Sequence, residues 1–438
     1  MTAVLDPTTG DTAFEVDPTP AGRAAEQLGA ARAAQARWAD LGALGRAAQL
    51  TAAADRVAAD DGLVELIVTD VGKPVTEAKA EVARAAAILR YAASLATSPA
   101  GEVFEDATGA HVRVVRVPRG VALLITPWNF PVAIPTWKLA PALQAGNAVV
   151  LKPATQACRI AQRLVSHLDL GDVVQLVPGG RDTAGALLDA GADAVSFTGS
   201  TATGRSIAER LAGRFIPLQL EMGGKNGVYV SDAADPATAA KVVLAGAMGY
   251  AGQKCTATSL AFVHERAADA VREQLVTQAK ALGVGDPHDA GTVVGPLIDA
   301  GHRDEVLERI AGAEVLLGGE GHGHAFLAPT LLTGDHPTNT EELFAPVLSV
   351  QPVGGVDDAL ARLDALEYGL VAGIVSPLRD EVEHFARHAD AGIVRVNAPT
   401  AGVEPHVPFG GVKNSSFGPR EQGRAGLEFF SETRTIYG

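Results

Sequence analysis

"VALLITPWNFPVAIPTWKLAPALQAGNAVVLKP", residues 121–153, holds two short apolar runs with a longer segment of helical composition between them. The runs at 121–126 and 148–153 are apolar almost throughout, which is typical of strands that are buried on both faces of a sheet. The segment 135–146 ends in glycine, a common helix terminator. A strand, a helix and a second strand in this order predict parallel strands covered by helices.

The same alternation continues as far as residue 213. Further strands are expected at 173–179 and 194–199, with helices at 154–168, 182–191 and 201–213. In sheets of this kind, ligands bind at the carboxyl ends of the strands. The predicted fold class is therefore α/β, with helices on both faces of a parallel sheet and a binding site at that edge.

The regions before residue 121 and after residue 213 have different sequence patterns. Residues 19–96 are rich in Ala, Leu, Arg and Glu at helical spacing and predict several helices. Residues 101–120 alternate polar and β-branched residues around "ATGA", which predicts an exposed hairpin that could pair with another subunit. After Glu221 a second α/β region begins, and the tail at 426–438 ends like a strand. The strands expected in this second region lie at 259–265, 326–332, 348–353, 371–376 and 392–397, and the helices at 267–282 and 380–390.

The bulk composition is that of a soluble globular protein with two or three domains. The chain has 438 residues, of which 47% are apolar and 20% charged, and a net charge of −15. This acidic balance argues against nucleic acid or an anionic membrane as the main partner. No long apolar run predicts a membrane span, and the N-terminus does not have the pattern of a secretory signal. Only two cysteines are present, which favours a reducing, cytoplasmic setting and no disulfide framework.

One of these cysteines lies in "GYAGQKCTAT", residues 249–258. Cys255 follows Lys254, and a nearby cation lowers the pKa of a thiol and so makes it a better nucleophile. Its small neighbours would let a substrate reach the sulfur. The alternative is an inert, buried cysteine that acts as a small apolar side chain, and the local sequence leaves both interpretations open.

Two further polar residues stand at the ends of expected strands. Glu221, in "LQLEMGGKN", closes an apolar strand, where a carboxylate invites a raised pKa and a general-base role. Asn129, in "ITPWNFP", lies in a turn between prolines, where its amide can donate to a developing oxyanion. A solvated strand end and an Asn that satisfies turn backbone are the structural alternatives.

Several loops have features of nucleotide or metal sites. "FTGSTATG" at 197–204 places a glycine turn before a helix N-terminus, which suits phosphate. It also resembles a P-loop, but Arg205 replaces the lysine that grips phosphate, which weakens a nucleotide-hydrolase interpretation. Lys152 is a candidate contact for ribose or phosphate. His322 and His324 lie in a glycine-rich loop, where two histidines are more often solvated than bound to a metal, so no metal site is predicted.

Taken in order, "PWNFP", "GNAVVLKP", "FTGSTATG", "EMGGKN", "GQKC", "EELFAP" and "PFGGVK" resemble the aldehyde dehydrogenase superfamily over nearly the whole chain. The resemblance implies a Rossmann-type cofactor domain, an α/β catalytic domain and a small β oligomerisation region. The implied ranges are 1–99 and 119–222 for the cofactor domain, 223–425 for the catalytic domain, and 100–118 with 426–438 for oligomerisation. A homodimer or homotetramer is implied by the same likeness.

The resemblance also implies roles for the polar residues. Cys255 would attack an aldehyde and pass through a thioester, Glu221 would activate the deacylating water, and Asn129 with the Cys255 N–H would bind the oxyanion. The expected cofactor contacts are Thr126, Pro127, Trp128, Lys152, Thr155, Gly199, Ser200, Glu342 and Phe344. A non-catalytic relative of the same fold is disfavoured because all three catalytic residues are present.

The cofactor and the substrate follow from two details. NAD-preferring relatives usually carry Glu where this chain has Thr155, so NADP is expected to be accepted alongside NAD. The sequences around Cys255 and at 402–423 look most like the branch that acts on 2-oxoglutarate semialdehyde, with a neutral aliphatic or aromatic aldehyde as the alternative. Lys254, Thr256 and Phe417 are the expected substrate contacts, and Lys254 faces either the substrate carboxylate or solvent.

Overall fold

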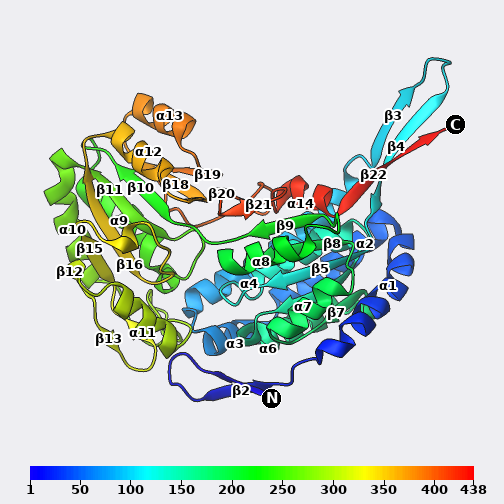
Figure 1. The fold of residues 1–438 in the computed structure, drawn as a ribbon, viewed down its shortest axis with the longest axis horizontal. Helices are drawn as coiled ribbons and strands as arrows, with labels where there is room; N and C mark the ends of the chain where they lie inside the picture. Colours follow the sequence, from blue (N-terminus) through cyan, green and yellow to red (C-terminus); the bar gives the residue numbers. More distant parts are fainter.

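A six-stranded sheet forms the core of one of the two lobes of the protein, whose computed structural model describes residues 1–438 (Figure 1). The strand order is β21-β9-β8-β5-β6-β7, and all strands except β21 are parallel. β5, the first of these strands in the sequence, therefore lies in the interior of the sheet. From β5 the chain adds β6 and β7 on one side and then β8 and β9 on the other, so the strand order reverses between β5 and β8. The strands are β5 (Val121–Thr126), β6 (Ala148–Pro153), β7 (Val174–Leu176), β8 (Ala194–Thr198), β9 (Leu218–Glu221) and β21 (Ser416–Phe417).

Helices cover both faces of this sheet, as the continuous apolar strands predict. Alternate residues of β5 point to opposite faces, so Leu123 and Leu124 belong to two different apolar clusters. One cluster joins the sheet to α1 (Ala24–Asp40), α7 (Arg181–Asp189) and α8 (Thr201–Leu211). The other joins it to α2 (Gly42–Ala58), α3 (Asp61–Val71), α4 (Val75–Ser94), α5 (Ala133–Gln144) and α6 (Cys158–Leu168).

A second, seven-stranded sheet carries the loop that contains Cys255. Its order is β12-β15-β16-β11-β10-β18-β19, and only β12 is antiparallel to its neighbour. Its strands are β10 (Asn226–Val230), β11 (Thr258–His264), β12 (Glu314–Leu317), β15 (Thr330–Thr333), β16 (Val347–Val353), β18 (Val371–Val375) and β19 (Ile393–Val396). One face packs on α9 (Pro236–Met248), α10 (Ala268–Lys280) and α11 (Ala300–Arg309), and the other on α12 (Val356–Asp364) and α13 (Arg379–His388).

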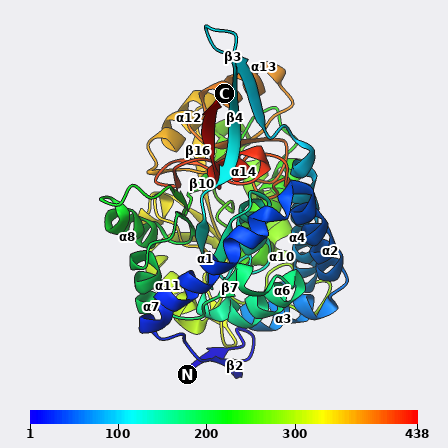
Figure 2. The same ribbon diagram turned by 90° about the vertical axis from the view of Figure 1, so that its right-hand side faces the viewer.

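A three-stranded antiparallel sheet projects from the body as a narrow arm (Figures 1 and 2). It consists of β3 (Gly101–Glu105), β4 (His111–Pro118) and the C-terminal strand β22 (Ser431–Tyr437), with β4 in the middle. The hairpin and the strand-like tail expected from the sequence are therefore both present, and they pair with each other.

Other elements differ from the sequence-based expectation. The single strand expected at 326–332 is two strands, β14 (Phe326–Leu327) and β15, because Pro329 lies between them and has no N–H for a sheet. The N-terminal hairpin of β1 (Thr2–Leu5) and β2 (Thr12–Val16) was not expected, nor was α14 (Gly423–Phe429) before β22. The remaining short strands are β13 (Gly321–His322), β17 (Tyr368–Gly369) and β20 (Val412–Lys413).

Two further observations concern classes of site. No helix in the protein has both the length and the apolar character that a bilayer crossing needs. No group of three or more His, Cys, Asp or Glu side chains has an arrangement that could hold a metal ion. His322, one of the two histidines noted in the sequence, stacks on Phe326 with 5.3 Å between ring centroids.

Candidate active site

Cys255 follows a tight turn of unusual backbone conformation. Three consecutive residues of the short helix η5 (Gly249–Gly252) adopt left-handed φ angles: 51° at Tyr250, 50° at Ala251 and 67° at Gly252. Non-glycine residues rarely adopt this conformation, and such strain is often found at functional sites. The turn delivers Cys255 just before β11 begins at Thr258.

The side chain of Gln253 fixes this turn from inside the protein. It is fully buried, its Nε2 donates to the carbonyl of Pro296 at 3.1 Å, and its Oε1 accepts from the N–H of Ile298 at 2.8 Å. A buried amide with both ends satisfied holds its backbone firmly. Gln253 therefore limits the positions that the neighbouring thiol can take.

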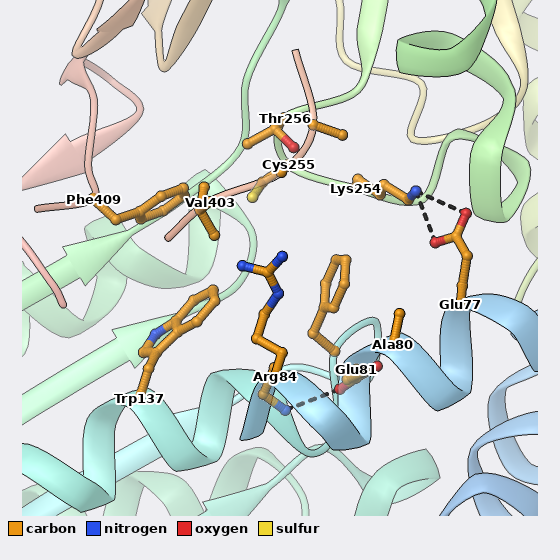
Figure 3. A pocket seen from close by; sticks show the side chains of 14 residues that line it. Glu77, Ala80, Glu81, Arg84, Trp137, Lys254, Cys255, Thr256, Val403 and Phe409 are labelled. Carbon is orange, nitrogen blue, oxygen red and sulfur yellow. Dashed lines mark hydrogen bonds and ion pairs between the residues drawn. The ribbon is translucent and has the colours of Figure 1, made fainter. Parts of the chain in front are cut away.

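Cys255 lies between two cavities, and it lines both of them. The first, of about 230 Å³, is bounded by the carboxyl ends of β5 and β8 and is called the strand-edge cavity below. The second, of about 180 Å³, is bounded by α4, α5 and the segment 401–409 and is called the helix-side cavity (Figure 3). Cys255 can therefore be approached from two sides.

The strand-edge cavity collects most of the residues expected to bind a cofactor. They come from three separate segments, which is why their grouping is informative. The lining includes Pro127, Trp128 and Asn129 after β5, Gly199 and Ser200 after β8, and Glu342 and Phe344 from the loop before β16. Trp128 and Phe344 meet edge to face, with centroids 5.8 Å apart.

This cavity has the position and the chemistry expected of part of a dinucleotide site. It opens where the strand order reverses between β5 and β8, the usual site for such ligands. The hydroxyls of Thr126 and Thr198, the last residues of those strands, are buried without a hydrogen-bond partner. Ser200 caps α8 by accepting from the N–H of Thr203 at 3.4 Å, so the positive helix end faces this region.

Lys152 and Thr155 lie at the neighbouring strand end and line neither cavity. Lys152 is on β6, whose last residue, Pro153, pairs with Thr126 of β5. Its Nζ donates only to the carbonyl of Pro153 at 3.2 Å, and burial lowers its pKa. Thr155 opens the short helix η3 (Thr155–Ala157) and is half-buried.

Asn129 is oriented for a donor role. Its Nδ2 donates to the carbonyl of Gln253 at 3.1 Å, and its side chain is buried in the wall of the strand-edge cavity beside Cys255. A side-chain amide has two N–H groups, so one stays available. The backbone N–H of Cys255 makes no hydrogen bond to another residue. These two donors can serve an oxyanion on an atom bonded to the sulfur.

Glu221 is buried close to this centre but lines neither cavity. Its carboxylate accepts a hydrogen bond of 2.6 Å from Ser416 of β21. Burial raises its pKa well above the usual carboxylate range, and the charge of Glu421 adds to this, while Ser416 and the cations Lys138 and Arg420 act in the opposite direction. A carboxylate whose pKa is raised in this way binds a proton more strongly than an ordinary carboxylate, which suits the general-base role expected of Glu221.

The electrostatic surroundings of Cys255 differ from the expectation that a cation activates it. Burial and the charges of Glu221, Glu342 and Glu421 all raise the pKa of its thiol. Lys254, the neighbouring cation in sequence, turns away and pairs with Glu77 at 2.8 Å. The expectation that Lys254 lowers the thiol pKa was therefore wrong, because adjacent side chains point in different directions.

The helix-side cavity holds two of the three expected substrate residues. Lys254 and Thr256 line it next to Cys255, whereas Phe417 lies on β21, is 57% exposed and lines neither cavity. Figure 3 also shows residues that the sequence did not single out, among them Arg84 and the aromatic side chains of Trp137 and Phe409.

A sequence signal for this wall did exist. On α4 the charged residues Glu77, Glu81 and Arg84 recur at helical spacing in an alanine-rich segment, so they share one face. Trp137 occupies the buried helix α5. Nothing in the sequence indicated that these two helices face Cys255, which depends on tertiary packing.

The chain belongs to the aldehyde dehydrogenase family, because its residues 1–436 match the model described as "Aldehyde dehydrogenase family". It is 41% identical to the alpha-ketoglutarate semialdehyde dehydrogenase of Haloferax volcanii over 401 residues, which cover 86% of this chain and 82% of that protein. The family and the α/β fold predicted from the ordered motifs are confirmed. The P-loop hydrolase interpretation of 197–204 is set aside.

Two solved structures with bound cofactor share the fold. Glyceraldehyde-3-phosphate dehydrogenase GapN from Methanocaldococcus jannaschii, complexed with NADP, has a TM-score of 0.94 and 28% identity, and the match covers 100% of this chain and 99% of that chain. Betaine aldehyde dehydrogenase from Staphylococcus aureus, in complex with NAD+, has a TM-score of 0.95 and 28% identity, with 99% and 91% covered. The protein is thus an aldehyde dehydrogenase that uses a nicotinamide cofactor.

Proposed function

We propose that the protein oxidises an acidic semialdehyde, of the 2-oxoglutarate semialdehyde type, to the dicarboxylic acid through a thioester on Cys255. The observation that carries this proposal is the position of the sulfur between two cavities, which lets one atom meet an aldehyde on one side and a nicotinamide on the other. The substrate class is supported by the activity that the H. volcanii relative is named for. A neutral aldehyde is the second candidate, favoured by the apolar side chains of Phe130, Trp137 and Phe409 in the helix-side cavity.

The first step is addition of sulfur to the aldehyde carbon. The thiol gives up its proton to solvent as the new C–S bond forms, and the carbonyl oxygen becomes an oxyanion. Asn129 Nδ2 and the Cys255 N–H donate to this oxyanion, and one such donor typically contributes about 3 kcal/mol to the transition state. The raised pKa of Cys255 keeps the free thiol protonated, which protects it from adventitious reaction until a substrate enters.

The second half of the reaction releases the acid. A nicotinamide held in the strand-edge cavity beside Trp128, Glu342 and Phe344 would supply the hydride acceptor through which the adduct on Cys255 becomes a thioester. Glu221 then takes a proton from a water molecule, whose oxygen attacks the thioester carbon, and the C–S bond breaks. Ser416 holds the Glu221 carboxylate in place until that step.

For the cofactor we propose that NADP is accepted, and that NAD serves as well. Thr155 is neutral, so it does not repel a 2′-phosphate, and Lys152 supplies a cation on the adjoining strand end. Lys152 forms no ion pair within the protein.

A reducing cytoplasmic setting fits the two free cysteines, Cys158 and Cys255.

For the assembly we propose a homodimer or homotetramer joined through the arm of β3, β4 and β22. The whole of β3 is exposed, including the large apolar residues Val103 and Phe104. An exposed apolar strand is an aggregation hazard unless a partner covers it, so a second copy of the chain is the expected partner.

The test is a panel of acidic and neutral aldehydes, followed by the absorbance of reduced nicotinamide with each cofactor. We expect the highest kcat/KM with 2-oxoglutarate semialdehyde, turnover with NADP as well as NAD, and none in Cys255→Ala although that variant still binds cofactor. Preference for uncharged aldehydes would contradict the substrate class. Full activity in Cys255→Ala would contradict the mechanism, and a strong preference for NAD would contradict the cofactor proposal.

A further inference from the structure

The helix-side cavity contains one arginine whose charge has no partner. Arg84 lies on α4, and its guanidinium points into the cavity toward Cys255 (Figure 3). Its Nη1 is completely buried and makes no hydrogen bond. Although Arg84 as a whole is only half-buried, a buried cationic donor without a partner is costly, so a native protein keeps it where a ligand or water satisfies it.

The other charged groups of the cavity wall are already compensated. The ammonium of Lys254 lies 2.8 Å from the carboxylate of Glu77. Glu81 pairs with Lys73, and its second oxygen accepts from the N–H groups of Val132 and Ala133, both at 2.9 Å. Arg84 is therefore the free positive charge of this cavity, and a ligand there is expected to be an anion.

The surroundings of Arg84 increase its value as an anion receptor. Trp137 and Phe409, with ring centroids 5.6 Å apart, form an apolar wall on one side of the same cavity. Excluding water strengthens a charge pair. The guanidinium also presents donors in a planar fork that matches a carboxylate with two parallel hydrogen bonds, which an ammonium cannot do.

We infer that Arg84 binds the distal carboxylate of the substrate and so selects an acidic semialdehyde. This inference rests on the proposed function, since it assumes that the aldehyde end of the same molecule meets Cys255. The geometry supports it because a single cavity contains both the sulfur and the guanidinium. Lys254, the cation suggested by sequence position, is the less suitable receptor because Glu77 neutralises it.

The helix that carries Arg84 is anchored to its neighbours. Glu81, one helical turn away from Arg84, pairs with Lys73 and accepts from the N–H groups at the start of α5. Glu81 therefore anchors α4, and Arg84 is the group expected to touch the substrate.

The experiment compares Arg84→Met and Arg84→Lys with the wild type on 2-oxoglutarate semialdehyde and pentanal, which have the same number of carbons. In Arg84→Met, the ratio of kcat/KM for the acidic over the neutral aldehyde should fall about 30- to 100-fold, mainly through KM, because truncating one partner of a desolvated charge pair costs this much. Arg84→Lys should restore part of the ratio. The matched control is Arg90→Met on the same helix, whose arginine pairs with Asp55 at the surface and should leave the ratio unchanged.

A second measurement separates this inference from the proposed substrate. 2-Oxoglutarate should inhibit pentanal oxidation by the wild type, and its inhibition constant should rise at least about tenfold in Arg84→Met, the loss of one charge-assisted contact. If the wild type prefers pentanal yet shows this Arg84-dependent inhibition, the substrate proposal fails and the anion site stands. If the wild type prefers the acid and Arg84→Met keeps both the ratio and the inhibition, the Arg84 inference is overturned. Loss of the ratio in Lys254→Met instead would assign the role to Lys254.

Discussion

At the scale of single residues, the thiol of Cys255 has carboxylates rather than a cation as the charges that shift its pKa. Burial raises the pKa of Cys255, and the charges of Glu221, Glu342 and Glu421 add to this effect. The residue types and their order singled out Cys255, Glu221 and Asn129, which the structure places near one another. They could not predict the electrostatics, because the direction in which Lys254 points and the burial of the carboxylates are properties of the packed structure.

The raised pKa of Glu221 gives the first prediction. Since its base form is populated only above the ordinary carboxylate range, kcat should rise with pH above that range while deacylation limits turnover. Glu221→Gln should lower kcat by about 10²- to 10⁴-fold and abolish this rise, yet still form one equivalent of reduced cofactor in a rapid burst.

Ser416→Ala is the companion variant for this prediction. The Ser416 hydroxyl donates to the ionised form of Glu221 and lowers its pKa, so removing it should move the rise in kcat to higher pH. A pH profile that is unchanged in both variants would exclude Glu221 as the base. Stopped-flow absorbance of reduced cofactor measures the burst, and steady-state rates at a series of pH values measure the rise in kcat.

At the scale of elements, the sequence predicted what depends on local pattern. The parallel strands β5, β6 and β8 and their helices follow from apolar runs and glycine terminators, which are short-range signals. The left-handed turn of η5 was not predictable, because two of its residues, Tyr250 and Ala251, are not types that favour positive φ. Surrounding contacts such as those of Gln253 impose it.

Gly252 should be the least replaceable residue of that turn. Its φ of 67° is strained for any other residue, and an added Cβ would overlap the carbonyl oxygen of Ala345. Gly252→Ala should lower the free energy of unfolding by about 1–3 kcal/mol. It should also reduce kcat/KM about 100-fold, since a shift of about 1 Å in a catalytic atom has that effect.

Gly213→Ala is the control for that substitution, because its Cβ would meet nothing within 4 Å and its φ is not in the left-handed region. Its stability should stay within about 0.5 kcal/mol of the wild type. Thermal or urea unfolding and steady-state rates on the same preparations test both variants. Equal behaviour of the two would mean that the turn is not under the constraint described.

At the scale of the whole molecule, the site exists because two sheets meet. Asn129 follows β5 and Glu221 ends β9, both strands of the six-stranded sheet, whereas Cys255 precedes a strand of the other. The rule that ligands bind at carboxyl strand ends located the strand-edge cavity from sequence. It said nothing about the helix-side cavity, because the packing of α4 and α5 against the 401–409 segment joins parts of the chain that no local pattern connects.

The arm extends this argument beyond one chain. β22 pairs with one side of β4 and β3 pairs with the other, so β3 is an outer strand of the arm, and all its residues are exposed. If a second subunit covers that strand, charges placed on it should disrupt the assembly, because burial of a large apolar side chain contributes about 1.5–3 kcal/mol. Val103→Asp with Phe104→Asp should therefore lower the molar mass measured by light scattering after size exclusion.

The matched pair Leu44→Asp with Phe215→Asp replaces apolar residues that are 70% and 96% exposed outside the arm, and should leave the mass unchanged. A mass that falls only in the second pair would place the subunit contact elsewhere on the protein.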